Sequence, residues 1–128
     1  MSHPALNAAD AAFTSALVES ARGPDRDGVF ALWLVVRAAL GGGGAAASVN
    51  PAGHAERLRA LAQRLRSLNA PAPLRRSLAT AVGELASPRA TPPAIVLQHL
   101  VAPAADTLGR RVADAVAAAA RAVRGSRS

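Results

Sequence analysis

Gln98 and His99 are the residues whose types come closest to a chemical site, because they interrupt the dense apolar segment 95–101. A histidine in that position can act as a general base, and Asp106, further along the chain, is the carboxylate that would orient its ring. A single histidine on an apolar helix is more often a core or partly exposed residue. We therefore expect a structural role for His99 and keep catalysis as an alternative.

The other sequence patterns that carry catalysis or cofactors do not occur. The sequence has no Cys, which excludes disulfides, thiolate metal sites and a cysteine nucleophile. Its three His, at positions 3, 54 and 99, form no closely spaced pair for a metal. There is no G-x-S-x-G elbow and no P-loop. Its eight carboxylates mostly stand at helix starts or in i, i+4 pairs, where capping and solubility explain them. We expect no enzymatic activity, no metal and no cofactor.

Positive charge is the compositional bias that bears most on function. The chain has 15 Arg, no Lys and 8 acidic residues, for a formal net charge of +7. Such a balance attracts nucleic acid, anionic lipid or acidic partners, although a GC-rich codon usage would also produce it. A basic nucleic-acid-binding protein is our alternative function, with phosphate contacts at Arg75, Arg76, Arg110, Arg111, Arg121 and Arg124. Asp106 and Asp114 would repel phosphate, and no aromatic side chains interleave these arginines for base stacking.

Pro and Gly divide the chain into segments with a helical hydrophobic period, and no strand pattern lies between them. The sequence predicts helices over residues 8–22, 26–40, 51–68, 73–86, 92–101 and 104–124. Pro103 lacks an amide hydrogen and its ring clashes with the preceding turn. We therefore place a kink or a break near Val101.

The predicted fold class is all-α, a compact bundle of five or six helices with a Pro-kinked C-terminal helix. We treat residues 1–128 as a single helical domain. It comprises an N-terminal helical pair (1–40), a Gly/Ala linker (41–49), a helical core (50–124) and a frayed tail (125–128). The linker would allow the N-terminal pair to pack on the core of the same chain or to swap into a second one.

Two of these segments present apolar surfaces that a partner could contact. In 26–40, apolar side chains point in all directions, which is typical of a central helix or of one that contacts a partner. In 51–68, leucines at 3-4-3 spacing form a narrow seam that Arg57 and Arg64 flank. A matching seam in 73–86 predicts an antiparallel αα-hairpin of these two helices. The predicted protein-interface residues are Phe30, Trp33, Leu34, Leu58, Leu61, Leu65 and Leu68.

The inventory of apolar side chains favours association with a partner. Of the 128 residues, 34 are Ala and only 31 are Val, Ile, Leu, Met, Phe or Trp. Ala buries little area, so the core of a lone monomer is thin, and small domains with thin cores often gain stability from association. We expect a non-enzymatic helical protein-interaction module (an adaptor, a small subunit or a self-associating component) that binds another protein or itself.

No segment is expected to cross a membrane. The best candidate, 29–49, contains Arg37 and four consecutive glycines at 41–44. A central Arg costs roughly 2.5–3.5 kcal/mol on insertion, and about 12 residues of helix span only about 18 Å. The first residues also lack the basic and apolar regions of a secretory signal. We therefore expect a cytoplasmic protein.

Overall fold

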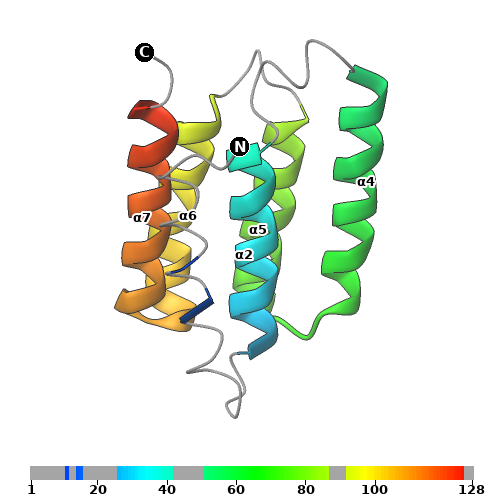
Figure 1. Cartoon of the computed structure of the whole chain (residues 1–128). Helices are drawn as coiled ribbons and strands as arrows, with labels where there is room; N and C mark the ends of the chain where they lie inside the picture. Colours follow the sequence, from blue (N-terminus) through cyan, green and yellow to red (C-terminus); the bar gives the residue numbers. More distant parts are fainter. Residues whose placement is uncertain (1–10, 12–13, 16–25, 42–50, 87–91, 126–128) are drawn as a thin grey trace.

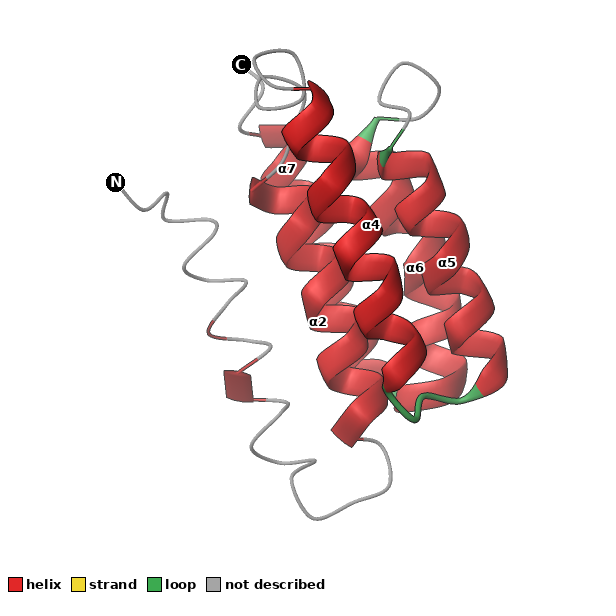
Figure 2. Ribbon diagram, turned by 90° about the vertical axis from the view of Figure 1, so that its right-hand side faces the viewer, coloured by secondary structure: helices red, strands yellow, loops and turns green. Residues whose placement is uncertain are grey.

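Helices make up nearly all of the chain that the structure describes. The computed structural model describes residues 11, 14–15, 26–41, 51–86 and 92–125. Its helices in these ranges are α2 (Arg26–Gly41), α4 (Pro51–Ser67), α5 (Ala72–Leu85), α6 (Pro93–Leu108) and α7 (Arg110–Gly125). They lie side by side with no strand among the described residues, so the predicted all-α bundle is confirmed (Figures 1 and 2).

Parts of the predicted organisation fall on other residues. Of the helix predicted over 8–22, only Ala11, Thr14 and Ser15 are described, and each is helical and exposed. The linker predicted over 41–49, beyond Gly41, lies outside the described residues. The same holds for the tail after Gly125.

The helices alternate in direction along the bundle (Figure 1). α4 packs against α5, and the two form the antiparallel hairpin that the leucine spacing predicts. The turn between them is joined to the first turn of α2, because the Asn69 amide donates to the Asp27 carboxylate at 2.8 Å. The loop between the hairpin helices and the start of α2 therefore lie at the same end of the bundle.

α2 is the central helix of the described bundle, as its apolar character on all sides predicts. It contacts each of the other four helices. On its inner side, Val29, Leu32, Val35 and Val36 are at most 1% exposed. Burying one such side chain contributes about 1.5–3 kcal/mol, so this row is a large share of the core.

The boundary between the last two helices differs from the prediction. α6 continues through Pro103 to Leu108, so the predicted break near Val101 is wrong, and no helix begins at 104. Pro103 does remove one amide donor from the helix. On either side of it, however, Leu100 and Ala104 are at most 1% exposed. Burial of the helical turns before and after Pro103 against the core allows the helix to continue through this residue.

The break falls at Gly109 instead. Gly109 has φ 100° and ψ 166°, a conformation that only glycine adopts readily. Its amide donates to the carbonyls of Ala104 and Ala105 at 3.1 and 3.2 Å, which closes α6. α7 then returns along α6, and the two form the most extensive helix pair in the described bundle.

The segment 29–49 is the best membrane candidate in the sequence. Its described part, residues 29–41, belongs to α2. Within the described ranges, no helix combines the length and the hydropathy that a bilayer span requires.

Two glycine-to-alanine substitutions should change the free energy of unfolding in opposite directions. Gly83 lies inside α5 with open space where a Cβ would sit, so Gly83→Ala should stabilise by about 0.5–1 kcal/mol. Gly109→Ala should destabilise by about 1–3 kcal/mol, because a φ of 100° disfavours a side chain. Urea unfolding followed by circular dichroism measures both. A Gly109→Ala protein as stable as the parent would contradict this backbone geometry.

Candidate functional site

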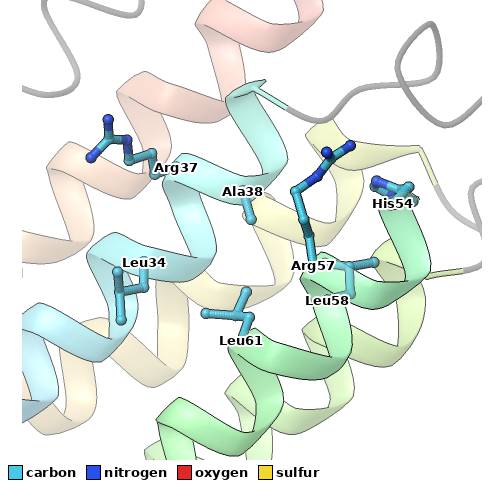
Figure 3. A pocket seen from close by; sticks show the side chains of 7 residues that line it. All are labelled: Leu34, Arg37, Ala38, His54, Arg57, Leu58 and Leu61. Atoms are coloured by element: carbon cyan, nitrogen blue, oxygen red, sulfur yellow. The ribbon is translucent and has the colours of Figure 1, made fainter. Parts of the chain in front are cut away.

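A groove lies between α2 and α4, and we call it the α2–α4 groove. Its volume is about 360 Å³. Its lining residues are Leu34, Arg37 and Ala38 from α2, and His54, Arg57, Leu58 and Leu61 from α4 (Figure 3). In Figure 3 the side chains of Ala38 and Leu61 lie in the space between the two helices, Arg57 rises from α4 beside it, and Arg37 extends from α2 on the side away from α4. The groove thus has an apolar floor and a basic rim.

The spacing of residues along the two helices produces this groove. Leu34 and Ala38 are four residues apart and share one side of α2. On α4, Leu58 and Leu61 are three residues apart and share the facing side. Ala38 carries only a methyl group, so it leaves the space opposite α4 unfilled. Both leucines that frame this space, Leu34 and Leu61, remain partly exposed.

His54 anchors one wall of the groove. It is only 7% exposed, and its Nε2 lies 3.2 Å from the carbonyl oxygen of Leu85 in the last turn of α5. Because a carbonyl only accepts hydrogen bonds, Nε2 carries the hydrogen and donates it. The bond satisfies one of the carbonyls that a helix leaves open at its C-terminus. It also holds the first turns of α4 against α5.

Two stacked aromatic rings with a cation at each end form a row along the outer side of α2, and we call it the cation–aromatic row. The rings of Phe30 and Trp33 are stacked, with centroids 5.9 Å apart. The guanidinium of Arg37 lies 5.1 Å from the Trp33 ring, and that of Arg64 lies 5.5 Å from the Phe30 ring. Each cation–π contact is worth about 0.5–1 kcal/mol at an exposed site. Arg64 comes from α4, so the row bridges the two helices that form the groove.

The predicted interface residues divide between this surface and the core. Leu34, Leu58 and Leu61 line the groove, and Leu58, at 5% exposed, also belongs to the core cluster. Phe30 and Trp33 belong to the cation–aromatic row. The other two predicted residues of α4 and its turn lie elsewhere. Leu65 is 8% exposed and belongs to the core cluster, and Leu68 is partly buried against that cluster. Their structural role is packing within the bundle.

Three residues that line the groove, namely Arg37, Ala38 and His54, are not among those that the sequence patterns predict for an interface. In the sequence, Arg37 stands out only as an obstacle to membrane insertion. The signal that could have found them is their helical spacing, since Arg37 and Ala38 follow Leu34 by three and four residues and His54 precedes Leu58 by four. Arg57, by contrast, does flank the leucine seam as its position predicts.

The arginines predicted to contact nucleic acid do not all lie together. Arg75 and Arg76, in the first turn of α5, and Arg110 and Arg111, in the first turn of α7, are exposed. Both first turns lie at the end of the bundle where α2 begins, and Arg26 is exposed there as well (Figure 1). We call this group of five arginines the basic end. Three helix N-termini at this end add positive partial charge.

The remaining predicted nucleic-acid contacts are farther away. Arg121 is exposed near the opposite end of α7. The side chain of Arg124 lies outside those that the structure describes. Asp106, in the last turn of α6, is an exposed carboxylate at the same end as the five arginines. The structure therefore brings four of the six predicted arginines to one end.

His99 does not have the partner that the sequence suggested. Its Nδ1 lies 3.8 Å from Oε2 of Glu84 on α5, beyond hydrogen-bond distance. Asp106 follows two helical turns later on the same helix, roughly 10 Å along its axis, so it does not orient the ring. His99 and Glu84 border a smaller cavity of about 190 Å³ between α5 and α6. At 3.8 Å the Glu84 carboxylate does not hold the His99 ring in the orientation that a general base needs.

Removing the His54 hydrogen bond should lower stability more than an equivalent change at the exposed His99. His54→Leu leaves the Leu85 carbonyl without its donor, and the expected loss is about 1–3 kcal/mol in the free energy of unfolding. His54→Gln keeps an amide donor and should lose less. His99→Leu is the matched control, because His99 is 62% exposed. Equal losses for the two leucine variants in urea unfolding would contradict the anchoring role of His54.

Comparison of the chain with protein-family models, with curated proteins and with solved structures found no match.

Proposed function

We propose that this protein is a protein-interaction module and that the α2–α4 groove receives an α-helix of a partner chain. The observation that supports the proposal is an open groove whose floor consists of Leu34, Leu58, Leu61 and Ala38, between two helices. An amphipathic helix binds in this way when its apolar face lies in a hydrophobic groove. Phe30 and Trp33 extend the apolar surface beside it.

The size and form of the groove suit side chains of a helix better than a small molecule. A volume of about 360 Å³ is near the lower end of ligand pockets, which span about 300–1,000 Å³. It holds a few aliphatic side chains, as an i, i+3, i+4 set would supply. Its polar lining consists of His54, whose Nε2 is already bonded, and two exposed arginines. Few convergent polar groups are therefore available to orient a small ligand.

Leu61→Glu should strongly weaken the binding of an apolar helix to the groove. A suitable probe is a fluorescein-labelled peptide of about 18 residues with a leucine stripe, glutamine elsewhere and no Trp. We expect anisotropy to show saturable binding to the parent protein, and at least a tenfold weaker affinity for Leu61→Glu, because a charge would then occupy the apolar floor. Trp33, the only Trp in the chain, gives an independent fluorescence signal beside the groove.

Gln63→Glu is the matched control for this experiment. Gln63 is exposed on the same helix and lies about 200° around it from Leu61, so the same charge should leave affinity unchanged. Apolar binding should also persist when the salt concentration rises from about 0.1 to 1 M, since burial of apolar surface drives it. Absence of binding to the parent protein, or equal losses in both variants, would remove the groove as the site.

Nucleic-acid binding is the second candidate function, and the basic end is the observation that favours it. Exposed arginines from the first turns of α2, α5 and α7 gather there. Guanidinium groups bind phosphate in a bidentate way. This site differs from the α2–α4 groove, so the two candidates are separable by mutation.

The double substitution Arg75→Ala/Arg76→Ala should weaken DNA binding if the basic end contacts phosphate. With a labelled duplex of about 20 base pairs, the slope of log affinity against log salt should fall in magnitude by about 2, because each lost phosphate contact removes about 0.9. Arg121→Ala, toward the other end of α7, is the control and should change little. No binding to the parent protein at about 0.05 M salt would exclude this function.

A further inference from the structure

We propose that the occupant of the α2–α4 groove is an amphipathic helix of a different protein, with acidic residues flanking its apolar stripe. The inference rests on the proposed function and specifies the chemistry of the partner. It comes from the charges on the groove and from the distribution of carboxylates over the described helices.

The rim of the groove is positive and contains no carboxylate. Arg37 and Arg57 are exposed and line it from opposite helices (Figure 3). Arg64 adds a third cation beside the Phe30 ring. Glu56, the one acidic residue of α4, is bound to Arg59 at 2.7 Å and is not part of the lining. A helix on this floor therefore meets cations along both of its flanks.

A second copy of the same face is a poor occupant. In a twofold dimer the same patch lies on both subunits, so each groove would bring its own Arg37 and Arg57 toward those of the other copy. Like charges placed together at an interface are unfavourable and suppress wrong partners. The basic rim thus disfavours face-to-face self-association.

The other described helices of a second copy do not fit either. Each of the five carries a single carboxylate, and these are Asp27, Glu56, Glu84, Asp106 and Asp114. Asp27 is bound to the Asn69 amide, and Glu56 to Arg59. None of these helices presents an exposed apolar stripe with acidic residues on both sides. The described helices of a second copy therefore offer no complementary occupant for the groove.

The geometry of the groove defines how such a helix would be recognised. Leucine-sized side chains at i, i+3 and i+4 would contact Leu34, Leu58 and Leu61. Carboxylates on either side of that stripe would reach Arg37 on α2 and Arg57 on α4, and a guanidinium group pairs with a carboxylate through two parallel hydrogen bonds. Rim charges of this kind set specificity and association rate more than affinity. We therefore expect a moderate, salt-dependent preference rather than an absolute one.

Three probe peptides test the preference. They share the length and the leucine stripe of the probe above and carry Glu, Gln or Lys at the flanking positions. At about 0.05 M salt the parent protein should bind the Glu peptide about tenfold more tightly than the Gln peptide, and the Lys peptide most weakly. At about 0.5 M salt the differences should largely disappear, because ions screen exposed charges.

Charge reversal at the rim should invert the order. Arg37→Glu/Arg57→Glu should bind the Lys peptide more tightly than the Gln peptide, and the Glu peptide most weakly. Arg66→Glu/Arg76→Glu is the matched control, since both residues are exposed and neither lines the groove. This control changes the net charge equally and should keep the order of the parent protein.

The outcomes separate this inference from the proposed function. If the parent protein binds the three peptides equally at low salt, the groove is a helix-binding site but the acidic preference is wrong. If the Gln peptide does not bind, the proposed function fails and the inference fails with it. Two further results would overturn the inference alone. One is a dimer in light scattering that Leu61→Glu dissociates, and the other is displacement of the Glu peptide by single-stranded DNA.

Discussion

Burial of α2 against the four other described helices is the constraint on which the structure depends. A helix of 16 residues that is apolar on all sides must bury one side completely, and Val29, Leu32, Val35 and Val36 do so. The helices around it differ in bulk, since α5 and α6 bury leucines such as Leu74, Leu78, Leu97 and Leu100, whereas most of the buried residues of α7 are Ala. The branched side chains of α2 therefore pack among leucines on one side and alanines on the other.

The same composition explains why the candidate site lies where it does. α2 has four partly exposed apolar residues on its outer side, Phe30, Trp33, Leu34 and Ala38, and α4 covers them only in part. Where the facing residue is Ala38, the two helices leave the α2–α4 groove between them. Where it is Phe30, Arg64 of α4 covers the ring and closes the gap. The space between α2 and α4 is therefore open at Ala38 and occupied by the Arg64 side chain at Phe30.

Much of this could be predicted from the sequence, and the exceptions have physical causes. Helical period and proline positions predicted α2, α4 and α5 closely, because each helix has an apolar stripe bounded by Pro or Gly. The predicted end of α6 was wrong because burial of the residues around Pro103 outweighs the loss of one backbone hydrogen bond. The observed end depends on the backbone conformation of Gly109, which leaves no periodic pattern in the sequence. Leu34 and Leu61 were found from their type. Arg37 and His54 were not, since their role depends on which residue of another helix lies opposite.

The two polar contacts of the α4–α5 hairpin determine how the groove can respond to an occupant. Near one end of α4, His54 is bonded to Leu85, and just beyond its other end, Asn69 is bonded to Asp27. Because hydrogen bonds hold α4 near both of its ends, we expect α4 to resist moving away from α2. A partner helix of the kind we propose would therefore meet a preformed site, which lowers the entropy cost of binding.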